Sequence, residues 1–182
     1  MAEWRAYDYL ESPQRQADMI IYPKPLTNEA FRTFGEVLET RGVAAELINE
    51  GHTQNFADLA SITVGNRGRV QVSIYRSRAI ELPFRIRNME RHPLGSQLFF
   101  PLQNRPFPVV VAPAEAIPGP DTIRVFLSDG RQGVNINPGV WHHYQMTLEQ
   151  SSDYIVIDRY GKGENREDFR LEKEIILDMP HL

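Results

Sequence analysis

The chain contains no cysteine among its 182 residues. Without a thiol, disulfides, thiolate nucleophiles, zinc–thiolate sites and iron–sulfur clusters are excluded. The absence of cysteine also fits a protein of a reducing compartment. We therefore expect a cytoplasmic protein whose chemistry rests on oxygen and nitrogen groups.

Long apolar runs and an excess of positive charge are also missing. No window approaches the roughly 18 consecutive apolar residues that span a bilayer, and acidic residues interrupt the first 18 positions, which excludes a secretory signal. A net charge of −4 and a pI near 5.7 give no electrostatic reason to expect nucleic acid or an anionic membrane. We expect a soluble protein with neither partner.

Short β-prone runs separated by glycine and proline turns make up most of the chain. They lie at residues 20–22, 37–39, 45–48, 61–64, 70–76, 109–112, 122–127, 133–136, 153–159 and 174–177. One short helix is predicted near the N-terminus, with Thr27 as its N-cap and Gly35 near its end. Many short strands with turns every ~8–12 residues predict an all-β sandwich or closed barrel. The length predicts one domain over residues 20–182, preceded by an arm over residues 1–19.

Two segments carry the polar groups of a candidate site. In the first, Glu90 and His92 are two residues apart, so an extended chain presents both on one face, and Gln97 follows at the start of an apolar strand. In the second, His142 and His143 follow a Pro-Gly turn. Successive residues of a strand point to opposite faces, so only one of these two histidines can face an enclosed cavity. We expect the two segments to build one buried polar site.

A further candidate lies in the run over residues 70–76. Val70, Val72, Ile74 and Arg76 share one face of this predicted strand, and Tyr75 belongs to the other. An arginine on an aliphatic face either lies in solvent at the strand end or reaches a buried anion.

The order Glu90-x-His92, Gln97, an apolar strand and then Pro-Gly-x-x-His142 resembles the two motifs of the cupin superfamily. Cupins are double-stranded β-helix barrels, or jelly rolls, that hold a divalent ion or a small ligand between the motifs. The resemblance places Glu90 where the first histidine of a usual cupin stands, with Gln97 in place of its glutamate. It implies His92, His142, Glu90 and Gln97 as metal ligands. Such a set would hold a metal more weakly than three histidines, and a metal-free site is the alternative.

Residues 90–97 and 133–143 closely resemble the ureidoglycolate lyase family, with supporting matches between about residues 21 and 160. The resemblance implies a homodimeric cytoplasmic cupin that splits ureidoglycolate into glyoxylate and urea during allantoin breakdown. Nickel has been associated with the family, and zinc or manganese are the alternatives. One departure is Asn55-Phe56-Ala57-Asp58, where Arg-Tyr-His-Asp is expected.

Elimination of urea from a carbinolamide needs a base, an acid and a cation for the carboxylate. Glu90 or His142 is the candidate base, and His92 is either a metal ligand or the proton donor. Arg76 is the candidate carboxylate clamp, because a guanidinium binds a carboxylate in bidentate fashion.

The remaining candidates would bind the rest of the substrate. Gln97 and Asn135 would contact the urea amide, while Asp158 and Arg159 form either a structural ion pair at the barrel mouth or a part of the substrate site. Three other functions stay open: a non-catalytic cupin that binds a small carboxylate, a lyase or hydrolase of a related ureido or carboxylic acid, and an iron-dependent dioxygenase. Gln97 argues against the last, which would need a carboxylate in its facial triad.

Overall fold

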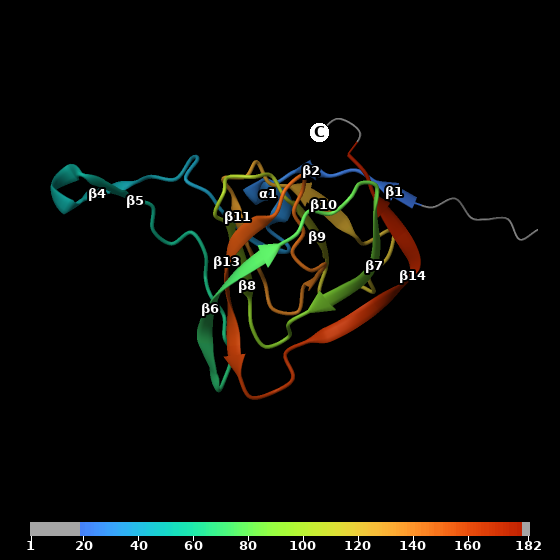
Figure 1. Ribbon diagram of the computed structural model, residues 1–182. Helices are drawn as coiled ribbons and strands as arrows, with labels where there is room; N and C mark the ends of the chain where they lie inside the picture. The colour runs from blue at the N-terminus through green and yellow to red at the C-terminus, as the bar shows by residue number, and fades with distance from the viewer. Residues whose placement is uncertain (1–18, 180–182) are drawn as a thin grey trace, which may run out of the picture.

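The computed structural model describes residues 19–179, and almost all of its regular structure is β-strand (Figure 1). The elements are β1 (Met19–Ile21), β2 (Lys24–Pro25), α1 (Asn28–Phe31), β3 (Gly35–Leu38), β4 (Glu46–Ile48), η1 (Asn49–Gly51), β5 (Thr53–Asn55), β6 (Gly68–Ser77), β7 (Phe84–Arg91), β8 (Gln97–Pro101), β9 (Pro108–Ala112), β10 (Arg124–Leu127), β11 (Gly133–Ile136), β12 (Trp141–His142), β13 (Ser152–Gly161) and β14 (Glu167–Leu177).

Two strongly curled sheets face each other. One has the order β1-β14-β7-β12-β9-β10-β2 and the other the order β3-β11-β8-β13-β6. Neighbours in the sheets are mostly distant in sequence, as in a jelly roll (Figure 1). The predicted all-β cupin-type fold is therefore confirmed. The predicted N-terminal arm lies outside the described residues, except Met19, which belongs to β1.

The predicted helix is confirmed but short. Thr27 caps α1 by accepting a hydrogen bond at Oγ1 from the Ala30 backbone N–H, at 3.2 Å. The helix ends early because the chain turns into β3 at Gly35, where a Cβ would lie 1.9 Å from the carbonyl oxygen of Asn135. Only a residue without a side chain permits this close approach.

The predicted strand over residues 61–64 is wrong. This segment runs over the outer surface of the barrel, and Thr63 exchanges hydrogen bonds with Ser96 instead of joining a ladder. Its β-branched residues favour a strand, but hydrogen bonds with Ser96 take the place of the ladder that a strand needs.

Two apolar clusters lie on opposite faces of the larger sheet. All five residues of β9 are buried: Val109 and Val111 point into the barrel cluster around Phe31 and Tyr154, while Val110 joins the second cluster on the outer face. A strand buried on both faces reads as a continuous apolar run, which is what its sequence contains.

The interior changes from apolar to polar along the barrel. Phe99 of β8 and Val156 of β13 are paired in register and lie in the barrel cluster. The next inward residues toward the other end are Gln97 and Asp158. This polar end is where the site lies. Within the described residues no helix is long and apolar enough to cross a membrane.

Candidate active site

The centre of the site is a register pair between two strands. β12 pairs with β7 so that His142 lies opposite Glu90, with His142 Nε2 3.8 Å from Glu90 Oε1. His92 follows directly after β7, and its ring centroid is 5.1 Å from that of His142. One ligand atom from each of the three residues lies within 4.8 Å of the others. The predicted convergence of Glu90, His92 and His142 is present in the structure.

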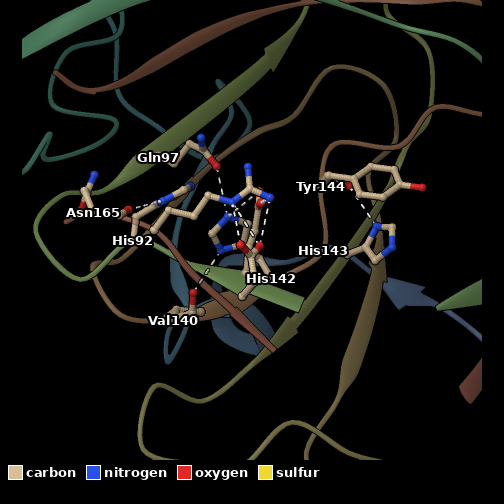
Figure 2. A network of polar contacts seen from close by, with 10 residues as sticks. His92, Gln97, Val140, His142, His143, Tyr144 and Asn165 are labelled. Carbon is tan, nitrogen blue, oxygen red and sulfur yellow. Dashed lines mark hydrogen bonds and ion pairs between the residues drawn. The ribbon is translucent and has the colours of Figure 1, made fainter. Parts of the chain in front are cut away.

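Backbone carbonyls orient both imidazoles (Figure 2). His142 Nδ1 donates to the carbonyl of Val140 at 3.0 Å, and His92 Nδ1 donates to the carbonyl of Asn165 at 2.7 Å. A carbonyl only accepts, so in each neutral ring the hydrogen is on Nδ1 and the lone pair is on Nε2. The Nε2 atoms point to the site centre, and that of His92 is buried without a hydrogen-bond partner.

Burial sets the charge of His142. The side chain is almost fully enclosed, and burial lowers its pKa from 6.5 to about 3, with the neighbouring His92 acting in the same direction. His142 is therefore neutral near pH 7 and presents a lone pair rather than a proton.

Gln97 is held between Asp158 and His142. Burial raises the pKa of the Asp158 carboxyl, and the Gln97 side chain opposes this shift by favouring the charged form. Gln97 Oε1 lies 3.1 Å from His142 Nε2, so its amide nitrogen is directed to the other side, toward Asp158, whose Oδ1 is buried without a hydrogen-bond partner among the described residues. The amide thus presents an acceptor to the centre of the site.

Four acceptor atoms consequently converge: Nε2 of His92 and His142, Oε1 of Gln97 and a carboxylate oxygen of Glu90. Acceptors this close need a cation or a donor-rich ligand between them. Imidazole, carboxylate and amide groups suit a divalent metal, and histidines oriented through Nδ1 by carbonyls are typical of metal ligands. The residues present therefore fit the metal that the cupin resemblance implies.

Two functional candidates were missed in the sequence. Arg166 precedes β14, and its Nη2 lies 2.9 Å from Glu90 Oε2. Tyr75 points inward from β6; burial raises its pKa, and the charges of Asp158 and Glu90 act in the same direction. No local motif marks Arg166, but the alternation over residues 70–76 separated Tyr75 from the aliphatic face and could have indicated it.

His143 faces away from the site, as the alternation predicted. Its ring packs edge-on against that of Phe84, with the centroids 5.6 Å apart. It also packs at a tilt against the ring of the next residue, Tyr144, with the centroids 3.9 Å apart (Figure 2). Burial lowers its pKa to about 4, so it is a neutral packing residue.

Three predicted substrate residues lie on the outer face of the smaller sheet instead of inside the barrel. Arg76 is exposed, and its guanidinium binds the Asp153 carboxylate in bidentate fashion at 2.8 and 2.9 Å. The prediction was wrong because the aliphatic face of β6 is its outer face. Arg159 points outward as the neighbour of inward Asp158, so the two form no ion pair.

Asn135 and Arg159 have structural partners. Asn135 Nδ2 donates to Glu36 at 2.8 Å and to the Ser61 carbonyl at 3.1 Å, because alternation on β11 sends Val134 and Ile136 inward. Arg159 donates to the carbonyls of Val64, Asn66 and Lys162. Both residues hold the segment that covers this face.

The segment that departs from the family pattern lies apart from the site. Asn55 ends β5, which pairs only with β4 in a small hairpin that projects from the barrel (Figure 1). Asn55 pairs with Glu46 in this hairpin, which shares no ladder with β7 or β12.

Barrel and centre together define a cupin-type protein with a buried histidine–carboxylate–amide site. Comparison with known proteins narrows this class: the family model of ureidoglycolate lyase matches residues 18–178, and the chain belongs to that family. It is 46% identical over 158 residues to a ureidoglycolate lyase of Pseudomonas paraeruginosa, covering 85% of this chain and 94% of the relative. It is 50% identical over 147 residues to one of Brucella anthropi, covering 80% and 86%. The protein is thus an enzyme of the lyase class.

Replacing Arg159 tests its structural role. Arg159→Ala removes a buried guanidinium from three carbonyls, so we expect the free energy of unfolding to fall by about 3 kcal/mol in urea titrations. Arg76→Ala, which removes an exposed arginine from the same face, is the control and should cause a clearly smaller change. Equal effects of the two substitutions would contradict the structural role.

Proposed function

We propose that this enzyme cleaves ureidoglycolate to glyoxylate and urea in the cytoplasm, as a carbon–nitrogen lyase of allantoin breakdown. The observation that carries the proposal is the convergence of Glu90, His92, His142 and Gln97 at the polar end of the barrel. This centre presents acceptor atoms, and ureidoglycolate supplies the matching donors through its hydroxyl and urea N–H groups. The names of the relatives support the same reaction.

Glu90 is the base of this reaction. It takes the proton of the substrate hydroxyl; the oxygen forms a carbonyl with its carbon, the carbon–nitrogen bond breaks, and its electron pair goes to the urea nitrogen. The protonated Glu90 then returns its proton to that nitrogen, so the step balances. His142 is less suited to act as the base, because its pKa of about 3 makes it a weak one.

Gln97 and Asp158 orient the urea end. The Gln97 oxygen accepts from the urea N–H groups, and Asp158 holds the amide in that orientation. Burial and the nearby charges of Asp158 and Glu90 raise the pKa of Tyr75, so its hydroxyl stays protonated and can donate a hydrogen bond. These contacts fix the substrate before the bond breaks.

A divalent metal, nickel first and zinc or manganese otherwise, would be held by His92, His142 and Glu90 with Gln97 as the fourth ligand. When bound it would lower the pKa of the substrate hydroxyl and reduce the basicity that Glu90 needs.

Release of glyoxylate from ureidoglycolate, measured with and without chelator, is the test of this function. We expect turnover by the purified protein, loss of activity with chelator and recovery with added nickel. Silence at a tenfold excess of nickel, zinc and manganese would overturn the proposal and favour a cupin that only binds small carboxylates.

Removing the base separates chemistry from binding. Glu90→Gln keeps the size of the side chain but cannot accept a proton, so kcat should fall by roughly 10²–10⁴-fold. Glu174→Gln is the matched control, since Glu174 pairs with Arg85 and Arg87 away from the site. Near-full turnover of Glu90→Gln would show that another group is the base.

We also propose a homodimer, formed through the outer face of β6. Val70, Val72 and Ile74 are 47%, 66% and 58% exposed on this strand, which is an edge of its sheet. A long apolar edge strand left in water invites association, so native proteins cover it. A second copy of the chain is the occupant that the family resemblance implies.

Sedimentation velocity of the wild-type protein and of Val72→Asp tests this interface. The wild type should sediment as a dimer at micromolar concentration, and Val72→Asp as a monomer, because the dimer would bury an unpaired carboxylate. Ile117→Asp, at a residue 77% exposed in a loop, should remain dimeric. A monomeric wild type, or a dimeric Val72→Asp, would contradict the interface.

A further inference from the structure

Arg166 lies beside the candidate base and on the rim of a pocket. Nη2 of its guanidinium is 2.9 Å from Glu90 Oε2, and its side chain is 63% exposed. Glu90 and Arg166 line a pocket of about 430 Å³ together with Asn88, Tyr144, Asp168 and Arg170. The pocket is therefore open to solvent at Arg166 and bounded by the reactive carboxylate.

The backbone that carries Arg166 is held against the first motif. Its neighbour Asn165 accepts from His92 Nδ1 through its carbonyl and from the Leu94 N–H through its side chain, at 2.7 and 2.8 Å. These two bonds fix the start of β14 relative to the histidine, so the position of Arg166 follows from the geometry of the site itself.

One edge of the guanidinium is occupied and the other is free. Nε and Nη2 donate to the Asp168 carboxylate at 2.9 to 3.2 Å. Nη1 makes no hydrogen bond with any residue the structure describes. An oriented guanidinium with unused N–H groups is prepared to bind an anion, because its plane is already fixed.

We propose that Arg166 binds the carboxylate of the substrate, and with it selects 2-hydroxy acids over their neutral analogues. This inference rests on the proposed lyase function. In a 2-hydroxy acid the carboxylate and the hydroxyl are on adjacent carbons, so the cation and the base must be neighbours. Arg166 and Glu90 meet this condition, whereas Arg76 and Arg159 lie on the outer face of the smaller sheet.

The lining of the pocket strengthens the assignment. Among the described residues that line the pocket, the cations are Arg166 and Arg170, and only Arg166 contacts Glu90.

The test compares a charged and a neutral small ligand. Dissociation constants of glyoxylate and of glycolamide are measured by calorimetry for the wild type, Arg166→Gln and Arg166→Lys, alongside the KM for ureidoglycolate. Arg166→Gln should weaken glyoxylate binding and raise KM by roughly 30-fold, with glycolamide binding unchanged and a smaller change in kcat. Arg166→Lys, which keeps the charge but loses the fork, should lie between the two.

Arg87→Gln is the matched control, because Arg87 is also an exposed arginine paired with a carboxylate, Glu174, but lies outside the pocket. It should behave as the wild type. Turnover with unchanged KM and glyoxylate binding in Arg166→Gln, or an equal loss for glycolamide, would overturn the carboxylate site and leave the lyase function intact. Glyoxylate binding that depends on Arg166 in a protein without turnover would support the site and overturn the function.

Discussion

The pairing of β12 with β7, which sets His142 opposite Glu90, is the constraint on which the site depends. Alternation along both strands then decides which side chains enter the barrel. His142 enters and His143 does not; Glu90 enters and Met89 packs in the outer cluster. A shift of one residue in either strand would exchange these faces and remove the site.

Two backbone carbonyls set the orientation of the histidine rings. By accepting the Nδ1–H of each histidine, Val140 and Asn165 direct both Nε2 lone pairs to one point. Gln97 adds its oxygen because Asp158 faces its nitrogen. A buried cluster of acceptors costs free energy unless a cation or a hydrogen-bond donor lies between them, so the unliganded fold favours binding of such a group. For the same reason, few residues suffice to hold a metal or a donor-rich substrate.

The two faces of the smaller sheet carry residues with different roles. Its inner face carries Gln97, Asp158 and Tyr75, which lie toward the candidate site. Its outer face carries Arg159 and Asn135, whose hydrogen bonds secure the covering segment, and the exposed aliphatic residues of β6. Charged residues adjacent in sequence therefore serve unrelated purposes: Asp158 faces the site, and Arg159 holds a loop.

Local patterns determined the all-β class, the cap at Thr27 and the candidate residues Glu90, His92, Gln97 and His142 that the structure brings together, because strand alternation and motif spacing are local properties. Only the tertiary structure decided which face of each strand is inside. The aliphatic face of β6 is its outer face, so of the two alternatives for Arg76 the solvent-exposed one holds, and its role as a carboxylate clamp fails. Arg166 could not be predicted, since it reaches Glu90 from the far end of the chain through the pairing of β14 with β7. Contacts between distant segments depend on register and curvature, which no short stretch of sequence encodes.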